Sequence, residues 1–393
     1  MQWKSTKETT TILLKTAMAT EQPVPKTHRA LVLTSRAEKP QVQTIPTPQV
    51  GPGSAVIRII QAGVLSYHRD IYSESKERPY PFPLPLVTGV SAVGRIAAVG
   101  SDATSLKPGQ LVFVDSYIHA RDNPSVGFLS GIHEGYTSGS QTLMRGEWKD
   151  STHAEYAKMP LENCHALDED RILGSPDKGG LGYLVEELAA LTKMAVAYGG
   201  LDDINLKAGE TIIVAPATGA FGGAAVEVAV AMGARVIAMG RNLDVLKSIA
   251  ARHERVDIVQ MTGNLETELD SLRKFGNIDA CYDISPPFAG QSTHLKSSIL
   301  ALRHGGRVSL MGGFRGDVPM PYSQIMHNNL LLRGKWMYDN TQMKALIKMV
   351  ETGVLKLGER AGLKCAGKFV LEDSEAAFTK AENYPRASLV LIP

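Results

Sequence analysis

The sequence predicts an α/β protein in which a compact β-rich domain precedes a doubly wound parallel sheet. Residues 29–160 hold short apolar runs separated by Pro- and Gly-rich turns, a pattern typical of an irregular β-barrel. From residue 211 onward, strand-like runs alternate with helical stretches at βαβ spacing, which indicates parallel strands covered by helices. A chain of 393 residues is long enough to build both cores.

The predicted elements follow in order along the chain. In the first region we expect strands at residues 29–33, 55–60, 92–99 and 111–114. In the second we expect parallel strands at 211–215, 235–239, 256–260, 278–282 and 307–311, with helices at 222–232, 243–251 and 293–302. The last part is predicted to hold a helix at 341–352, a strand at 368–371, a helix at 373–381 and a final strand at 387–392.

The C-terminal segment is too short to bury a core of its own, so we expect it to complete the first domain. This assigns residues 29–185 and 338–393 to the β-rich domain and residues 186–337 to the parallel sheet. Residues 1–28 are predicted to be a disordered tail, with Met18 as an alternative start. A transit peptide is the other interpretation, and Glu8, Glu21 and the lack of arginine before Arg29 argue against it.

Composition excludes several classes of partner. A net charge of +2, from 42 basic and 40 acidic residues, leaves no broad electrostatic footprint for nucleic acid or an anionic membrane. No apolar run approaches the ~20 residues that span a bilayer. The three cysteines, Cys164, Cys281 and Cys365, are far apart and odd in number, which argues against a disulfide framework or a clustered zinc site. We expect a reducing, cytoplasmic compartment.

The run after the predicted strand 211–215 has the layout of a nucleotide-binding turn. Gly219 and Gly222 carry no Cβ, so the backbone there can approach a pyrophosphate. The following helix would offer free N–H groups and a partial positive charge at its N-terminus. Pro216 departs from the usual G-x-G-x-x-G spacing. We predict a nucleotide cofactor bound by Ala217, Thr218, Gly219, Ala220, Phe221 and Gly222.

A set of markers in a fixed order gives the chain a wider resemblance. The markers are residues 30–33, Gly63-Val64 leading to Asp70, Gly89, Gly94, Val99-Gly100, and residues 107–113, 209–215 and 302–313. With them, residues 29–393 resemble the medium-chain dehydrogenase/reductase superfamily. The resemblance implies a GroES-like β-barrel catalytic domain, a doubly wound parallel Rossmann sheet inserted before its last segment, and hydride transfer in the cleft between them.

The chain departs from the zinc-dependent members at the positions of their metal ligands. Those positions read Tyr67, Val90 and Thr192, and zinc sites use Cys, His and Asp or Glu almost exclusively. The four-cysteine lobe is also missing, and residues 116–146 form a polar, glycine-rich insert instead. Its Ile132-His-Glu-Gly135 run resembles a metal or acid/base pair, and we interpret it as a surface loop. We predict no metal, as in the family's zinc-free quinone and enoyl reductase branches.

The end of the second Rossmann strand bears on the choice of cofactor. NAD-dependent members place an acid there, whereas this chain has Gly240, Arg241 and Asn242, and Arg241 can bind a 2′-phosphate through a charge-assisted fork. We predict NADP(H); the alternative is that Arg241 is only a solvated residue at a helix start.

The ends of later strands line the nicotinamide in the family. The corresponding residues here are Ser285, Met311, Gly312 and Gly313, which could equally be ordinary turn residues.

Four residues are candidates for catalysis because of their places in the resemblance. Tyr67 could donate a proton to a developing enolate, or it could be a core aromatic. His68 could relay a proton, or it could contact the cofactor or solvent. Thr192 and Lys193 stand where the third zinc ligand would be, so they could face the nicotinamide, or they could form a pair on a helix surface. We expect Arg69 and Asp70 to form a local ion pair.

The predicted activity is transfer of a hydride from NADPH to a polarised C=C bond or a quinone or carbonyl acceptor, because such acceptors do not require a metal to stabilise an alkoxide. The substrate is expected to be a small, hydrophobic molecule. The alternatives are an NADP-dependent alcohol or carbonyl oxidoreductase without zinc, and a cofactor-binding subunit without turnover. The apolar edge strand at residues 330–336 pairs across the interface in family dimers, which favours a homodimer.

Overall fold

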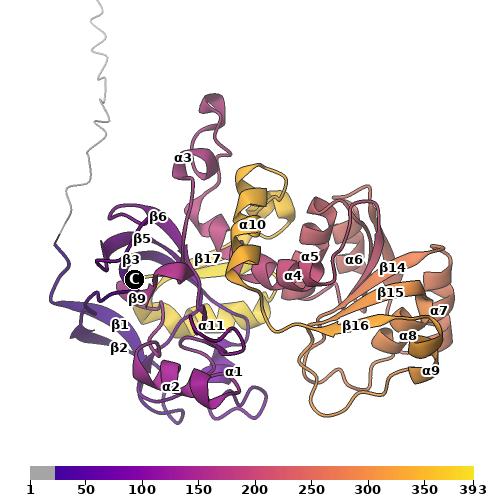
Figure 1. Cartoon of the computed structure of the whole chain (residues 1–393), viewed down its shortest axis with the longest axis horizontal. Coiled ribbons are helices and arrows are strands. Elements are labelled where there is room, and N and C mark those ends of the chain that lie inside the picture. The colour runs from indigo at the N-terminus through magenta and orange to yellow at the C-terminus, as the bar shows by residue number, and fades with distance from the viewer. Residues whose placement is uncertain (1–22) are drawn as a thin grey trace, which may run out of the picture.

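The computed structural model describes residues 23–393 and has two lobes (Figure 1). A β-rich lobe is built from the first half of the chain and its last strands, and a second lobe is built around one parallel sheet. The predicted α/β fold class is therefore confirmed. The predicted tail lies outside the described residues as far as residue 22, and β1 already begins at Thr27. None of the helices in the described part combines the length and apolarity needed to cross a bilayer.

The β-rich lobe contains three sheets. The first has the strand order β2 (Gln41–Pro46), β1 (Thr27–Leu33), β4 (Leu86–Val87). The second has the order β10 (Cys164–Ala166), β6 (Leu111–Val114), β5 (Ala92–Val99), β3 (Ser54–Gly63), β18 (Ser388–Ile392), β17 (Cys365–Val370), and β9 (Tyr156–Pro160) also pairs with β3. The third, within the insert, pairs β7 (Tyr117–His119) with β8 (Gly127–Leu129).

The last strand of the chain returns to the first lobe. Val390 and Leu391 of β18 pair with Gly63 and Ala62 of β3 in antiparallel register. Leu389 and Leu391 are buried in an apolar cluster with Leu31 of β1, so the C-terminus supplies part of this lobe's core. The helices of this lobe are α1 (His68–Tyr72), α2 (Ser138–Gly146), α3 (Glu169–Ile172) and α11 (Ser374–Asn383).

The parallel sheet has the strand order of a doubly wound nucleotide-binding fold. The order is β13 (Val256–Gln260), β12 (Arg235–Gly240), β11 (Thr211–Ala215), β14 (Ile278–Asp283), β15 (Leu302–Leu310), β16 (Leu331–Gly334). All of the pairings are parallel, and the winding direction reverses between β11 and β14. In such sheets ligands bind at the carboxyl ends of the strands beside this reversal.

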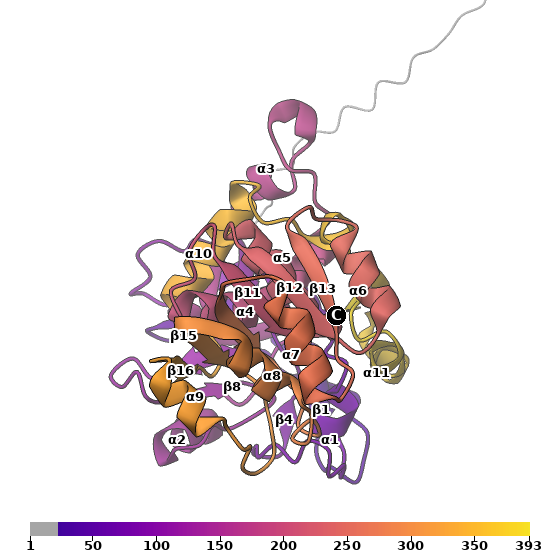
Figure 2. The same ribbon diagram turned by 90° about the vertical axis from the view of Figure 1, so that its right-hand side faces the viewer.

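Alternate residues of each central strand pack on opposite faces of the sheet. Ile212 and Val214 of β11 join a cluster with one set of helices, and Ile213 and Ala215 join a cluster with the other. In Figure 2 these two helical layers flank the strands. The first layer contains α4 (Leu191–Asp203), α5 (Ala220–Ala231), α6 (Leu243–Ala250) and α10 (Asn340–Glu351), and the second contains α7 (Leu265–Arg273), α8 (His294–Ala301) and α9 (Tyr322–His327).

Helix α4 lies at the junction of the two lobes, and the sequence patterns did not predict it. Its residues are buried on nearly every side, so it lacks the one-sided apolar periodicity that marks a surface helix. Gly199 and Gly200 allow close contacts with the segment before α10 and with the parallel sheet. A Cβ at Gly199 would lie 2.4 Å from the carbonyl oxygen of Met337, and one at Gly200 would lie 2.7 Å from Ser309 Oγ.

Candidate active site

The turn after β11 has the geometry of a phosphate-binding site. A Cβ at Gly222 would lie 1.9 Å from the carbonyl oxygen of Pro216, so only glycine fits where α5 crosses the turn. The N–H of Ala217 donates to the carbonyl of Met239 at 2.7 Å, which joins the turn to β12. Gly219 is exposed, and no side chain caps the first turn of α5. Free N–H groups of that turn therefore suit a pyrophosphate.

The other predicted residues of the turn differ in what they can offer a cofactor. The methyl group of Ala217 is fully buried in the core, so its backbone is the part that faces the turn. Thr218 and Ala220 are half-buried, and Phe221 packs against the apolar clusters of both lobes. A Cβ at Gly240 would lie 2.5 Å from Thr218 Cγ2, so the end of β12 abuts the turn.

Arg241 and Asn242 follow β12 and are both exposed. The Oδ1 atom of Asn242 accepts a hydrogen bond from the N–H of Val245 at 3.1 Å and so caps α6. The carbonyl of Arg241 accepts a hydrogen bond from the side chain of Gln260 at 3.3 Å. No carboxylate pairs with the Arg241 guanidinium among residues 23–393, which leaves this cation available beside the strand end.

The predicted nicotinamide side is held together by a buried polar network that the sequence analysis missed. The Ser285 hydroxyl donates to Asp283 Oδ1 at 2.5 Å and lies 2.7 Å from Nε2 of His294. The N–H groups of Met311 and Gly313 donate to the carbonyls of Asp283 and Ser285, both at 2.9 Å. A Cβ at Gly312 would lie 2.4 Å from Asp283 Oδ2. The network fixes the ends of β14 and β15, and the Ser285 hydroxyl already has partners within it.

Arg386 is a second feature that the sequence analysis missed. Its Nη2 atom lies 3.6 Å from the position of a Cβ on Gly223, in the first turn of α5. Its Nη1 atom is buried without a partner in the described part of the chain. Burial lowers the pKa of Arg386, and the nearby Arg252 lowers it further. A buried, positively charged hydrogen-bond donor near the helix N-terminus suits a phosphate group. Only the return of the C-terminal segment brings Arg386 to this place.

Tyr67 and His68 are neighbours in sequence and lie in different surroundings. Tyr67 is half-buried, and its ring lies beneath the guanidinium of Arg78 at 3.8 Å. Its hydroxyl has no partner among the described residues, and burial raises its pKa. His68 is fully buried against the rings of Tyr72, His153 and Phe378. Burial lowers the pKa of His68 well below its ordinary value, so its ring stays neutral.

Thr192 and Lys193 are buried in α4 rather than placed on a helix surface. Thr192 Oγ1 is buried without a protein partner in the described chain and lines a cavity of about 10 Å³ together with Val90. Tyr67 packs against the apolar cluster that contains Val90. Two of the three positions that correspond to zinc ligands, Val90 and Thr192, therefore line one small cavity. Between residues 23 and 393, no three His, Cys, Asp or Glu side chains cluster as metal ligands would.

The buried amine of Lys193 predicts a dependence of stability on pH. Its Nζ donates to the carbonyl of Ala387 at 2.9 Å, and burial, together with Arg386, lowers its pKa from 10.5 to about 8. Between these two pH values the unfolded chain holds a proton that the folded chain has released, so the free energy of unfolding rises with pH, by about 3 kcal/mol at most. Lys193→Met should remove this rise in urea unfolding measured from pH 8 to 10.5. Lys207→Met, at an exposed lysine, is the control, and equal slopes for Lys193→Met and wild type would contradict the prediction.

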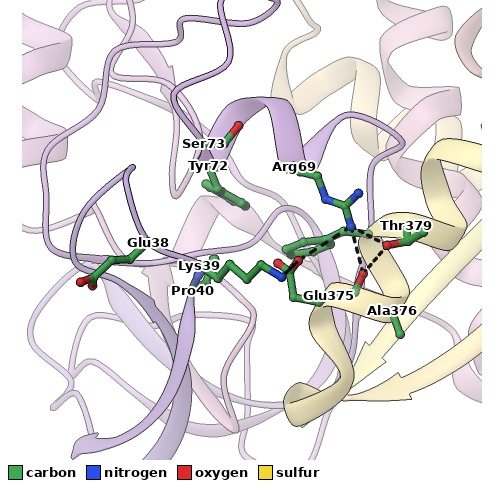
Figure 3. Close-up of a pocket in the computed structure, with 10 residues that line it drawn as sticks. Glu38, Lys39, Pro40, Arg69, Tyr72, Ser73, Glu375, Ala376 and Thr379 are labelled. Atoms are coloured by element: carbon green, nitrogen blue, oxygen red, sulfur yellow. Dashed lines mark hydrogen bonds and ion pairs between the residues drawn. The ribbon is translucent and has the colours of Figure 1, made fainter.

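A pocket of about 520 Å³ lies elsewhere, between α1, α11 and residues 38–40 (Figure 3). Arg69 and Lys39 point toward Glu375 across it, and their ion pairs measure 3.8 and 3.1 Å. Arg69 also pairs with Glu382 at 2.9 Å. The predicted ion pair between Arg69 and Asp70 is therefore wrong, because the guanidinium reaches across to α11. The pocket contains none of the predicted cofactor residues.

The prediction of a surface loop at residues 132–135 is also wrong. His133 and Glu134 are each 4% exposed, because the insert folds back on itself. Glu134 forms a bidentate ion pair with Arg145 of α2 at 2.9 and 3.0 Å, and its N–H donates to the carbonyl of Pro81 at 2.8 Å.

Comparisons with known proteins agree with this geometry. Two family models match: "Alcohol dehydrogenase GroES-like domain" over residues 51–169 and "Zinc-binding dehydrogenase" over residues 220–352. The chain is 23% identical to an L-threonine 3-dehydrogenase of Anaeromyxobacter dehalogenans over 365 residues, which cover 92% of this chain and 98% of that protein.

Two solved structures share the fold over 94% of this chain. A crotonyl-CoA carboxylase/reductase has a TM-score of 0.73 at 16% identity, with 89% of its own chain covered. A zinc-binding dehydrogenase of Sinorhizobium meliloti 1021 bound to NADP has a TM-score of 0.71 at 17% identity, with 100% of its chain covered.

Proposed function

The chain belongs to the medium-chain dehydrogenase/reductase superfamily, and from this premise we propose that it is a zinc-independent, NADP(H)-dependent reductase of conjugated carbonyl or quinone acceptors. Its membership makes it an oxidoreductase with a nicotinamide cofactor. The observation that carries the finer proposal is the set Tyr67, Val90 and Thr192 at the positions that the resemblance gives to zinc ligands, two of which, Val90 and Thr192, line one small cavity. We place the enzyme in the cytoplasm, since its three cysteines are all free.

The residues around the turn fit NADP(H). The first turn of α5 and the unpartnered Nη1 of Arg386 would hold the pyrophosphate, and Arg241 would bind the 2′-phosphate. The strand end itself carries no acid to repel that phosphate, since the three residues after β12 are Arg241, Asn242 and Leu243 and the first carboxylate is Asp244 in α6. When bound, the cofactor supplies the hydride.

Zinc independence is supported by the chemistry of the donor set. The family model described as a zinc-binding dehydrogenase matches residues 220–352, a range that includes none of the three ligand positions. A tyrosine, a valine and a threonine do not make a zinc site. Zinc analysis of the purified protein tests this directly, and stoichiometric metal would overturn it.

The chain's own residues would stabilise and protonate the acceptor. The Tyr67 hydroxyl is protonated at neutral pH, and burial raises its pKa further, so it can donate a hydrogen bond to an oxygen that gains negative charge. The guanidinium of Arg78, above the same ring, favours the phenolate left after proton transfer. The unpartnered Thr192 Oγ1 can donate a second hydrogen bond. The neutral, enclosed His68 shapes the loop and does not relay protons in this scheme.

Tyr67→Phe should lower kcat for enone and quinone acceptors about 100-fold, with little change in KM, because the lost proton donor acts in the transition state. The measurement is NADPH oxidation followed at saturating and limiting acceptor. Tyr72→Phe is the control: this buried hydroxyl accepts from the N–H of Gly89 at 2.9 Å, so its loss should lower Tm and leave kcat of the folded enzyme near wild type. Unchanged turnover in Tyr67→Phe on every acceptor would remove Tyr67 from the mechanism.

Two other activities are separated by the same assay. The similarity to a protein named L-threonine 3-dehydrogenase favours, as a second candidate, NADP-dependent oxidation of an alcohol without zinc. NADP+ reduction by a panel of alcohols, with no NADPH oxidation by enones or quinones, would select it. Binding of NADPH with no turnover in either direction would indicate a subunit without catalysis.

We also propose a homodimer formed through β16. Within residues 23–393 this strand pairs with β15 on one side only, and Leu331 on it is 50% exposed. A second copy would cover both the apolar side chain and the free backbone edge. Light scattering should therefore give a mass of twice one chain, and Leu331→Arg should shift it toward the monomer. Lys344→Glu, on α10, is the control and should leave the mass unchanged. A wild-type monomer would refute the dimer.

A further inference from the structure

An aromatic cluster around His133 has no role in the proposed chemistry so far. The centroid of the His133 ring lies 4.9 Å from that of Tyr80, 4.9 Å from that of Tyr136 and 5.8 Å from that of Trp336. Tyr136 and Trp336 also contact each other, at 5.3 Å. Tyr136 is 77% exposed and Trp336 is 38% exposed, whereas His133 lies beneath them. The two exposed rings and the histidine beneath them therefore form one contiguous aromatic surface.

The cluster lies where the two lobes meet and is continuous with Tyr67. Trp336 belongs to the segment between β16 and α10, and the other rings come from the β-rich lobe. Tyr80 contacts His133 on one side, and its hydroxyl accepts from Arg78 at 3.1 Å on the other. Arg78 in turn covers the ring of Tyr67. Tyr80 and Arg78 therefore connect the cluster to the candidate proton donor.

The His133 side chain supplies a single, oriented hydrogen-bond donor. The N–H of Gly135 donates to its Nδ1 at 2.9 Å, so the neutral ring carries its proton on Nε2. Burial lowers the pKa of His133 to about 4, which keeps the ring neutral at physiological pH. The Nε2 atom has no hydrogen-bond partner in the described chain and is not among the fully enclosed polar atoms. It can therefore donate to a ligand.

The loop that carries His133 is held in place before any ligand arrives. Gly135 has a φ of +75°, and a Cβ there would lie 2.4 Å from the carbonyl oxygen of Gly127. Glu134, between His133 and Gly135, forms a bidentate ion pair with Arg145 and so connects the loop to α2. Binding would order little of the chain, which favours affinity.

We propose that His133, Tyr80, Tyr136 and Trp336 form the acceptor site and select a planar, conjugated ring carbonyl, whose oxygen accepts a hydrogen bond from Nε2 of His133. Ring faces suit flat π-systems, and one donor suits one carbonyl oxygen. A hydroxyl-rich substrate would leave most of its polar groups without partners here. The role of this site in catalysis rests on the proposed reductase function. Its binding of a planar ring carbonyl can be tested without any turnover.

Binding of chromone, a flat ring carbonyl, to the full-length protein tests the site by isothermal titration. Wild type should bind chromone with a Kd below about 1 mM, His133→Phe should weaken it about tenfold by removing the donor, and Tyr136→Leu about fivefold by removing a stacking face. His133→Gln, which restores a donor, should recover part of the loss. Tyr322→Leu is the matched control, since Tyr322 is 79% exposed on α9 and should leave binding unchanged. Absent binding, or equal binding by wild type, His133→Phe and Tyr136→Leu, would overturn the assignment.

Turnover separates this proposal from the proposed function. In wild type and Tyr136→Leu, kcat/KM is compared for 1,4-naphthoquinone, which is planar, and trans-2-hexenal, which is linear. Tyr136→Leu should lower the value for the quinone selectively, and equal losses for both acceptors would count against the site. Chromone binding that depends on His133, without NADPH oxidation by any acceptor, would retain the site and refute the reductase. NADPH oxidation without chromone binding would do the reverse.

Discussion

Gly222→Ala should abolish measurable NADPH binding, with a loss of more than about 100-fold, and should also lower Tm. The new methyl carbon would lie 1.9 Å from the carbonyl oxygen of Pro216 and 3.0 Å from Cα of Ala217. Both contacts are with backbone, so the turn itself must move, and overpacking of this kind typically costs about 1–3 kcal/mol. Fluorescence titration with NADPH and thermal unfolding measure the two effects.

Two other glycines separate the loss of the cofactor site from a general loss of folding. Gly219 has a φ of −84° and open space around its Cβ position, so Gly219→Ala should keep Tm and weaken NADPH about tenfold, because the methyl group intrudes where a phosphate would approach. Gly146, at the end of α2, also has open space, and Gly146→Ala should change neither quantity. Wild-type affinity in Gly222→Ala would show that the turn does not hold the cofactor.

Arg241→Asp should reverse the preference between NADPH and NADH, lowering affinity for NADPH about 100-fold. The substitution replaces a guanidinium that can bind a 2′-phosphate with a carboxylate that repels it and accepts hydrogen bonds from ribose hydroxyls instead. Arg241 is exposed and unpaired with any acid within residues 23–393, so little stability should be lost. Steady-state kinetics with each cofactor at a fixed acceptor concentration measure the ratio of kcat/KM.

A change of charge alone could alter the affinity for an anionic cofactor, so the comparison needs a variant with the same change. Lys247→Glu, on the exposed face of α6, also changes the net charge by two units and should keep the preference for NADPH. If both variants lower the NADPH affinity equally, Arg241 makes no specific contact. If Arg241→Asp leaves the preference unchanged, the proposal of NADP(H) is wrong.

Much of the fold could be predicted because local patterns report on local backbone. The predicted strands 92–99, 111–114, 211–215 and 256–260 match the bounds of β5, β6, β11 and β13. Their apolar runs end at glycine, proline or polar residues, which mark strand ends in any context. Helix α4 and strand β9 were missed, since α4 is apolar all round and β9 is short, with Lys158 among its apolar residues.

The candidate site was predictable in part. The turn at Gly219 and Gly222 and the cation after β12 could be named because a single segment carries each of them. The network of Asp283, Ser285 and His294 could not be predicted. It joins the end of a strand to a residue beyond a loop, and no local sequence pattern fixes the path of that loop. Arg386 was missed for the same reason, and His133 was assigned to a surface loop because its neighbours in sequence are small and polar.

The sequence by itself determined the fold class and the glycine turn that suits a dinucleotide, and the resemblance aligned Tyr67, Val90 and Thr192 with the positions of zinc ligands. These are properties of short segments, where the side chain and the backbone it requires stand together. Only the tertiary structure decided that Arg386 reaches the first turn of α5 and that His133 lies beneath Tyr136 and Trp336 with a donor still free. Such contacts join segments far apart in the chain, and their positions follow from how the two cores pack together rather than from any single stretch of residues.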